Sequence, residues 1–431
     1  MPTYLSRTPS SAGNRTLWTW SGWLKKLRDV SGDAVWAGFT DSNNRMRLNF
    51  LSDGRIEIFG YISSTQVQVI TTRVFRDFAS WYHIVWVWDT AQSTNSNRTK
   101  VYINGEQLTN FDTTNWPAQN SESVINNNTG QYIGQRGDGS SQLSGYLTDI
   151  NFINGQALTP STFGETDSTT GEWKPKVDFP GLTYGTNGFR LQFGNAAALG
   201  TDTSGQSNNF TVNGAGTNAK TVDTATNNFV TMNPLVIFEG SNSPNNKPDY
   251  SKGNTVATAS NGTTRFAMST MATTMPYYFE VKVLSTSSTD TSQRVGVIDE
   301  SAFGEPATYS SVYRGDGSIT ATGESNNTGN QTLSTNSIIG IAVDLATNYN
   351  IKYYHNGTLQ ATMAVGAAYR SLATSPFARL VDATQSFSFN FGNPSYTISS
   401  GNSDANGLGS FEYAVPSGYY ALCTKNINSY G

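Results

Sequence analysis

Short apolar runs alternate with turn residues along most of this chain. In the first part of the sequence, the runs of strand length are residues 17–24, 45–50, 55–61, 67–75, 81–88, 101–103 and 147–153. Gly-containing turns such as Ser52-Asp53-Gly54 and Asn154-Gly155 separate these runs. Closely spaced short strands with such turns predict an antiparallel sandwich. Parallel strands would need long crossover connections, usually helical, and the pattern shows no helical segment of that length.

One pattern occurs twice. Each copy consists of a strand that ends in Asp, a polar loop, and a second strand that runs into Asn-Gly. The copies span residues 81–105 and 338–357. Asn104-Gly105 and Asn356-Gly357 are strong hairpin signals, because both residues of a tight two-residue turn need a positive φ. The doubled pattern predicts a β meander in each half of the chain, and hence two sandwiches.

A chain of 431 residues exceeds what one hydrophobic core usually serves. We expect a first sandwich in residues 1–165, an extended connector in residues 166–250, and a second sandwich in residues 251–431. The connector is rich in Thr, Asn, Gly and Ser, so a disordered linker is the alternative interpretation. Within it, residues 188–193 alternate like a strand, and residues 228–235 are expected to pack against the second sandwich. The expected fold class is all-β.

Each half resembles a known domain family. The first half resembles the laminin G-like, concanavalin A-like jelly roll through Trp18-Thr19-Trp20-Ser21-Gly22-Trp23, Trp81-Tyr82-His83-Ile84-Val85 and Gly145-Tyr146-Leu147-Thr148-Asp149-Ile150. The second half resembles a SPRY domain through Tyr278-Phe279-Glu280-Val281 and Gly340-Ile341-Ala342-Val343-Asp344. These resemblances imply two antiparallel jelly-roll sandwiches joined by the loop-rich connector.

The order of the parts resembles that of virion proteins of marine tailed phages, cyanophages among them. Beyond the two domains, the resemblance includes Trp173-Lys174-Pro175-Lys176 and Tyr184-Gly185-Thr186-Asn187-Gly188-Phe189 in the connector, and Pro416-Ser417-Gly418-Tyr419-Tyr420 near the end. It implies a non-enzymatic structural protein on the virion surface, as a head decoration or as part of a tail or fibre appendage. Its partners would be capsid or tail proteins and further copies of itself with closed cyclic symmetry, and it would be made in the host bacterial cytoplasm. The alternatives are a carbohydrate-binding adhesin that attaches to host surface glycans, and a polysaccharide-cleaving enzyme.

Composition limits the partners. The net charge of -4 and the isoelectric point near 5.3 provide no basic field for a phosphate backbone, so we expect no nucleic-acid binding. Cys423 is the only cysteine, so the fold must hold without an intrachain disulfide. The N-terminus has no apolar core of signal-peptide length, and no apolar run is long enough to span a membrane. We therefore expect no membrane insertion.

Few residues suggest catalysis. Glucanases with the concanavalin A-like fold point two carboxylates into one groove. Here Asp299-Glu300 are adjacent and would face opposite sides of a strand, and Glu165 and Asp167 lie in a polar loop. His83 and His355 each lie in a strand of the doubled pattern, and a lone strand histidine is more often structural than part of a Ser-His-Asp triad. We expect no catalytic residues and no cofactor, with calcium as the open alternative.

The calcium alternative depends on the first resemblance. Laminin G-like domains often hold calcium through Asp and Asn oxygens on rim loops, and the resemblance suggests Asp33, Asp41 and Asn43 as ligands. Asp and Asn are also among the commonest turn formers, so turn formation is the competing interpretation.

The remaining candidates could bind a ligand from loops. Arg136-Gly137-Asp138-Gly139-Ser140 recurs as Arg314-Gly315-Asp316-Gly317-Ser318. An Arg-Gly-Asp triplet suggests receptor binding, but Gly-Asp-Gly also forms tight turns, which is the favoured interpretation. Aromatic rings in loops could stack on a sugar or anchor a neighbouring subunit. The candidate ligand-binding residues of the rim loops are Trp116, Arg136, Asp138, Tyr309, Tyr313, Arg314 and Asp316.

Overall fold

The computed structural model describes residues 3–28, 32–214, 219–236, 247–260, 264–286, 291–299 and 309–431. Their contacts divide the chain into two compact units, Met1–Lys220 and Thr221–Gly431. Residues 166–220 of the expected connector therefore belong to the first unit, and residues 221–250 belong to the second. Glu300, one of the acids considered above, lies outside the described residues. Among the described residues, no helix is long and apolar enough to cross a membrane.

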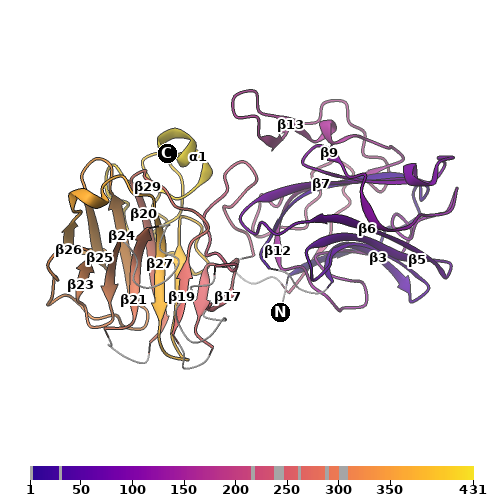
Figure 1. The fold of residues 1–431 in the computed structure, drawn as a ribbon. Helices are drawn as coiled ribbons and strands as arrows, with labels where there is room; N and C mark the ends of the chain where they lie inside the picture. Colours follow the sequence, from indigo (N-terminus) through magenta and orange to yellow (C-terminus); the bar gives the residue numbers. More distant parts are fainter. Residues whose placement is uncertain are drawn as a thin grey trace. The chain divides into compact units, whose positions relative to one another are not determined.

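The first unit is a sandwich of two antiparallel sheets, and Figure 1 shows β7 in one layer and β3, β5 and β6 in the other. The eight-stranded sheet has the order β10 (Phe111–Asn115), β6 (Thr65–Val74), β5 (Arg55–Ile62), β4 (Asn44–Phe50), β3 (Asp33–Asp41), β11 (Gly130–Ile133), β1 (Tyr4–Arg7) and β16 (Thr211–Asn213). The six-stranded sheet has the order β15 (Phe189–Leu191), β12 (Gly145–Asn154), β2 (Leu17–Lys26), β7 (Trp81–Asp89), β8 (Thr99–Ile103) and β9 (Glu106–Gln107). A separate hairpin joins β13 (Gly164–Thr166) to β14 (Trp173–Pro175).

Large aromatic side chains fill the space between these two sheets. Because side chains alternate between the faces of a strand, every second residue of β2 and β7 points into the core. Trp18 and Trp86 meet edge to face there, with ring centroids 4.8 Å apart. Trp20, Trp86 and Trp88 are fully buried there as well.

The second unit is also a sandwich of two sheets. One sheet has the order β17 (Asp249–Ser251), β18 (Val256–Thr258), β28 (Ser386–Asn390), β20 (Tyr277–Ser285), β24 (Ile338–Asp344), β25 (Asn350–His355) and β26 (Thr358–Ala364). The other has the order β19 (Arg265–Met268), β27 (Thr374–Leu380), β21 (Arg294–Asp299), β22 (Ser310–Arg314) and β23 (Ile319–Ala321). A short strand, β29 (Tyr420–Ala421), pairs in parallel with β20, and a short helix, α1 (Thr424–Tyr430), follows it.

The all-β prediction of two antiparallel sandwiches is confirmed. The strand expected in residues 188–193 is β15, which pairs with β12. The segment 228–235 packs on the second unit as expected, since Val230 and Met232 belong to its core. The parallel pair of β29 with β20 and the helix α1 were not predicted.

A buried carboxylate fixes the C-terminal segment on the outer face of the second unit. On β20, the side chains of Tyr277 and Phe279 point into the core, so that of Glu280 points outward. It is nonetheless fully buried, because the returning chain covers it. The carboxylate oxygens of Glu280 accept hydrogen bonds from the backbone N–H groups of Glu412 (3.0 Å) and Tyr413 (2.9 Å). The side chains that also donate to this carboxylate are those of Asn390, Tyr278 and Tyr396.

The Asn-Gly turns have the same construction in both units. Asn104 and Asn356 have φ values of 50° and 47°, and the glycines that follow them also have positive φ. The backbone N–H of Asn356 donates to the carbonyl of Ile338 (2.8 Å), and the N–H of Ile338 donates to Oδ1 of Asn356 (2.8 Å). Asn104 makes the same two hydrogen bonds with His83 (2.9 Å and 2.8 Å). Asparagine therefore serves twice at this position, in the left-handed turn and as an acceptor for the neighbouring strand.

We expect Asn356→Ala to lower the free energy of unfolding of the second unit by about 1 to 2 kcal/mol, because alanine tolerates positive φ poorly and cannot accept from Ile338. The matched control is Asn356→Asp, which keeps both the acceptor oxygen and the tolerance of positive φ. Urea titration of the two variants measures the difference. An alanine variant as stable as the aspartate variant would contradict the dual role of this side chain.

The two units carry different spectroscopic and chemical reporters. All nine tryptophans lie between residues 18 and 173, so tryptophan fluorescence follows the first unit. Cys423 is fully buried in the second unit, so the rate at which a thiol reagent modifies it follows the opening of that unit.

Candidate functional site

In the first unit, the outer face of the six-stranded sheet is covered by the chain itself. Val85, Val87 and Ile153 form a buried cluster there with Phe163 and Tyr184 of the segment that follows β12. Figure 1 shows β13 on the side of β7 that faces away from β3 and β5. A ligand site of this unit is therefore better sought on the outer face of the eight-stranded sheet or at the edges of the sandwich.

The outer face of the eight-stranded sheet carries a band of aromatic, amide and guanidinium side chains, which we call the outer band. Met46 and Leu48 of β4 and Ile58 of β5 point into the core, so the residues between them point outward. Strand register places Arg47 beside Phe59, and Phe59 beside Gln68. The outer band consists of Phe39, Arg45, Arg47, Phe59, Tyr61, Gln66, Gln68 and Tyr132, all partly buried.

Arginines concentrate at one end of the outer band. Arg45, Arg47 and Arg136 line a small pocket together with Asp138. Arg47 lies 3.6 Å from the carboxylate of Glu57, and Arg136 lies 3.1 Å from that of Asp138. Burial, followed by repulsion from Arg136, lowers the pKa of Arg47 to about 10. Two carboxylates thus face three guanidinium groups, which leaves one positive charge in excess.

A second concave feature lies where the edge strands of the two sheets approach each other. This groove has a volume of about 600 Å³ and opens to solvent between β10 and the chain around β8 and β9. Trp116, directly after β10, packs edge to face on Phe111 with ring centroids 5.4 Å apart. The other lining residues are mostly polar, namely Thr72, Ser96, Asn97, Thr99, Lys100, Gln107, Leu108, Thr109, Asn110 and Thr114.

The structure brings together some of the predicted ligand-binding residues. Trp116 lies in the groove, and Arg136 and Asp138 lie beside the outer band. Oδ1 of Asp138 also accepts hydrogen bonds from the backbone N–H (3.0 Å) and the hydroxyl (2.6 Å) of Ser140, which closes the turn. Burial would raise the pKa of Asp138, but these hydrogen bonds, with the charge of Arg136, lower it overall.

The prediction of ligand-binding residues in the second unit is wrong for its two tyrosines. Tyr309 and Tyr313 do not lie on an exposed loop, because both are fully buried in the core between the two sheets. Arg314 ends β22, half-buried, and Oδ1 of Asp316 closes the next turn by accepting from the N–H (2.9 Å) and the hydroxyl (2.6 Å) of Ser318. The two Arg-Gly-Asp sequences therefore both form turns, as the favoured interpretation requires.

The suggested calcium ligands do not form one site. Asp33 and Asp41 are the first and last residues of β3, and at 3.3 Å per residue they lie roughly 25 Å apart. Asp33 is buried and accepts from the backbone N–H of Ser144, whereas Oδ1 of Asp41 accepts from that of Asn43 (2.7 Å) within the β3–β4 turn. The prediction of a shared calcium site is wrong, because Asp33 and Asp41 are eight positions apart on one extended strand.

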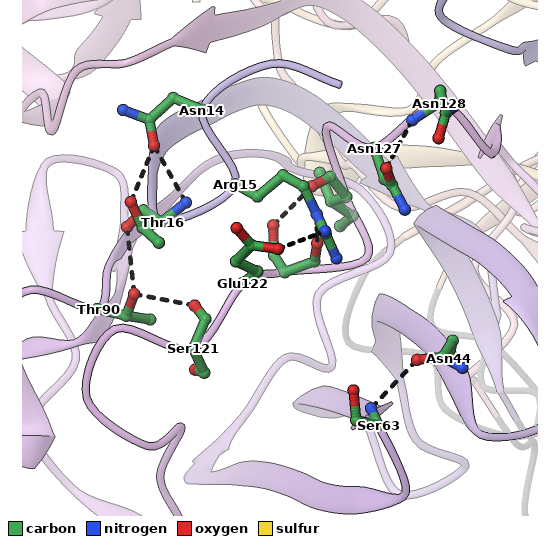
Figure 2. Close-up of polar contacts among 12 residues, drawn as sticks. Asn14, Arg15, Thr16, Asn44, Ser63, Thr90, Ser121, Glu122, Asn127 and Asn128 are labelled. Atoms are coloured by element: carbon green, nitrogen blue, oxygen red, sulfur yellow. Dashed lines mark hydrogen bonds and ion pairs between the residues drawn. The ribbon is translucent and has the colours of Figure 1, made fainter. Parts of the chain in front are cut away.

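Other Asn side chains at the rim also satisfy local backbone groups. Figure 2 shows Oδ1 of Asn44 accepting from the N–H of Ser63 (3.1 Å), and Oδ1 of Asn127 accepting from the N–H of Asn128 (2.9 Å). In the same view, the guanidinium of Arg15 pairs with Glu122 (2.6 Å). Turn formation therefore accounts for these rim oxygens.

The geometry around His83 does not suit a nucleophilic serine. Nε2 of His83 lies 2.8 Å from Oγ of Ser21, and Nε1 of Trp173 lies 3.0 Å from its Nδ1. An indole N–H can only donate, so Nδ1 accepts and the ring proton resides on Nε2. Nε2 therefore donates to Ser21 and cannot remove the hydroxyl proton, as a general base would. Burial lowers the pKa of His83 to about 3, so the ring stays neutral and fixes Trp173 and its hairpin to β7.

Two of the acids considered for glycoside cleavage, Asp167 and Asp299, bind other groups of the protein. Asp167 pairs with Lys174 (2.8 Å) and accepts from the N–H groups of Thr169 and Thr170, which together hold its pKa well below its ordinary value. A general acid needs the opposite shift. Asp299 is buried and accepts from the backbone N–H of Tyr309.

The residues that sequence reasoning missed are those of the outer band. Arg45, Arg47, Phe59 and Tyr61 occupy the positions between core residues of two neighbouring strands, so the alternation itself carries a signal. Two aromatic residues at solvent-facing positions of one strand are unusual for a purely structural surface. Their approach to Arg45 and Arg47 depends on strand register, which the sequence does not specify.

Two protein families match the chain, one in each unit. Residues 4–163 match the Concanavalin A-like lectin/glucanases superfamily, and residues 276–394 match the SPRY domain. No curated protein matches the chain significantly.

Solved structures align with this chain at low TM-scores. Domains LG4-5 of the mouse laminin alpha1 chain align over 98% of this chain and 84% of their own length, with 10% identity and a TM-score of 0.30. The SAP-like pentraxin from Limulus polyphemus aligns over 36% and 71%, with 20% identity and a TM-score of 0.27. A human SPRY domain aligns over 31% and 90%, with 12% identity and a TM-score of 0.25. On the family matches, the chain carries a laminin G-like, concanavalin A-like domain followed by a SPRY domain, two lectin-like sandwiches that suggest a carbohydrate-binding or adhesion-type function.

Proposed function

We propose that this protein is a non-enzymatic glycan-binding protein displayed on the surface of a tailed-phage virion. The observation that carries the binding role is the groove at Trp116, about 600 Å³ in volume and lined by an aromatic pair, amides and hydroxyls. A sugar ring offers a C–H face for an aromatic side chain and hydroxyls for amide partners, and the volume is that of a small-ligand site. The groove would take one or two sugar rings of a host surface glycan.

The virion location is supported by the order of the parts. A laminin G-like domain, the aromatic-anchored segment that follows it and a SPRY domain resemble virion proteins of marine tailed phages in that order. In this role the two sandwiches are rigid display units on the head or on a tail or fibre appendage. The protein is held by capsid or tail proteins and by sister copies, after synthesis in the bacterial cytoplasm. Antibody labelling of particles tests the location, and absence of the protein from purified virions would contradict it.

We expect Trp116→Ala to weaken binding to the best ligand on a host-glycan array by about tenfold or more, because it removes the stacking surface of the groove. Trp116→Phe keeps an aromatic ring and should retain part of the affinity. The matched control is Tyr430→Ala, which removes an exposed aromatic side chain from the second unit. Tryptophan fluorescence verifies that the first unit stays folded. If Trp116→Ala folds and binds the array like the wild type, the groove is not the glycan site.

A further inference from the structure

The arginine pocket of the outer band holds a guanidinium group without a carboxylate partner. Among the residues that the structure describes, no carboxylate pairs with Arg45, and its buried Nε has no hydrogen-bond partner. Leaving a buried donor unsatisfied is unfavourable, so a pocket built this way favours a ligand that can accept a hydrogen bond.

Aromatic faces contact two of these arginines. The guanidinium of Arg47 lies 4.2 Å from the ring centroid of Phe59, and that of Arg45 lies 5.2 Å from the centroid of Tyr61. Arg47 also donates through Nε to Oδ1 of Asn49 (2.9 Å). Contact with the aromatic faces leaves the N–H groups of Arg45 to bind an oxyanion, and guanidinium N–H groups recognise carboxylates and sulfates.

A glycine lets the third arginine reach the pocket. A Cβ atom on Gly137 would lie 2.1 Å from Cβ of Phe39, so only glycine allows the turn to rest on that ring. The neighbouring Arg136 and Asp138 then line the pocket beside Arg45 and Arg47. The turn that resembles a receptor-binding triplet thus contributes its arginine to the cluster on the sheet.

We propose that this pocket binds an anionic substituent of a glycan, a carboxylate of a uronic acid or a sulfate ester. The pocket is too small for a whole sugar ring and has room for about one oxygen atom of an oxyanion, and Phe59, Tyr61, Gln66 and Gln68 extend from it across β5 and β6 as a surface for the attached sugars. Three arginines against two carboxylates supply the complementary charge. The inference rests on the proposed glycan-binding function and specifies the acidic class of glycan.

The test measures binding of the full chain to charged and uncharged forms of the same glycans. Oligogalacturonides and their methyl esters differ at the carboxylate, which the ester neutralises with a methyl group, and dextran sulfate and dextran differ in the sulfate, so the two pairs distinguish the two anions. We expect at least one charged form to bind about tenfold or more tightly than its neutral form, and the advantage to shrink as salt increases. A DNA oligonucleotide of equal charge serves as the comparison for unspecific attraction.

Substitutions of the pocket arginines test whether the tighter binding of the charged glycan depends on the pocket. Arg45→Gln and Arg136→Gln should each remove most of the advantage of the charged form, because each deletes an N–H donor set and one positive charge. Arg73→Gln, which removes an exposed arginine paired with Glu106 outside the pocket, should retain it. Unchanged tryptophan fluorescence and melting temperature show that the variants are folded.

Different outcomes separate the two proposals. If neutral host glycans bind and depend on Trp116, but no charged form binds more tightly, the anion pocket is overturned and the proposed function stands. If no glycan of either kind binds, both fail. Equal binding of DNA, or a charge advantage that survives both pocket variants, would also overturn the pocket.

Discussion

Glu280→Ala should lower the free energy of unfolding of the second unit by roughly 3 to 5 kcal/mol, because each buried donor that it leaves unsatisfied costs about 1 to 3 kcal/mol. For a unit of this size, that corresponds to a fall in melting temperature of about 10 °C. The expected effect is large because two backbone N–H groups and three side-chain donors converge on one carboxylate in the interior. Burial raises the pKa of Glu280, and the backbone N–H groups of Tyr413 and Glu412 oppose that shift.

The reactivity of Cys423 reports on the C-terminal segment that Glu280 holds. Cys423 and Phe411 share a buried cluster with Tyr278 on the outer face of β20, which the C-terminal segment covers. Loss of the carboxylate should release this segment, so a thiol reagent should modify Cys423 at least about a hundredfold faster than in the wild type. Tryptophan fluorescence, which follows the first unit, should give an unchanged urea midpoint.

Glutamine at position 280 is not expected to hold the C-terminal segment as the carboxylate does. Each carboxylate oxygen accepts from a backbone N–H, Oε1 from Tyr413 and Oε2 from Glu412, so either orientation of an amide would place its NH₂ group against a donor. Glu280→Gln should therefore be nearly as unstable as Glu280→Ala. Glu324→Gln, which changes a partly exposed acid of the same unit, should be close to the wild type. A glutamine variant with wild-type thiol protection would show that the carboxylate does not hold the segment.

Local signals in the sequence were sufficient to predict the architecture. A two-residue hairpin turn needs positive φ at both positions, and the Asn-Gly pairs at 104–105 and 356–357 satisfy that need between two strands. Alternation located the strands because one face of each is buried in a sandwich. These features depend on residues close in sequence, and they determined the fold class before any long-range contact was known.

Contacts between distant residues could not be predicted in the same way. The alternation around Glu280 shows that it points away from the core, but the segment that covers it lies more than 100 residues further along the chain. Tyr309 follows a stretch that reads as a loop, yet it enters the core. The outer band likewise requires the register of β3 to β6, and a shift of one residue would separate Arg45 from Tyr61. A polar residue in a strand therefore indicates that its side chain points away from the core. Whether that side chain stays accessible to a ligand or is covered by another segment depends on long-range contacts.

His83 should make the stability of the first unit depend on pH in a predictable direction. The pKa of this histidine is about 3 in the folded chain and near its ordinary 6.5 in the unfolded chain, because burial disfavours the charged ring. Between these values only the unfolded state binds the extra proton, so the contribution is complete above about pH 6.5 and is lost as the pH falls toward 3. At about 1.4 kcal/mol per pH unit, the free energy of unfolding should be roughly 2 kcal/mol lower at pH 5 than at pH 7.

His83→Gln isolates this contribution, because glutamine can still bond to Ser21 and has no titratable group. Urea titrations between pH 5 and 7, followed by tryptophan fluorescence, measure the free energy of unfolding. It should fall with decreasing pH in the wild type and change much less in the variant. Burial also lowers the pKa of His355, but this residue belongs to the second unit and does not enter the tryptophan signal. Trp173→Phe removes the indole donor to Nδ1, so the ring proton is no longer confined to Nε2 and the hairpin should loosen. If the free energy of unfolding depends on pH equally in the wild type and in His83→Gln, the folded chain binds a proton at His83. That result would contradict a neutral His83 that accepts the hydrogen bond of Trp173.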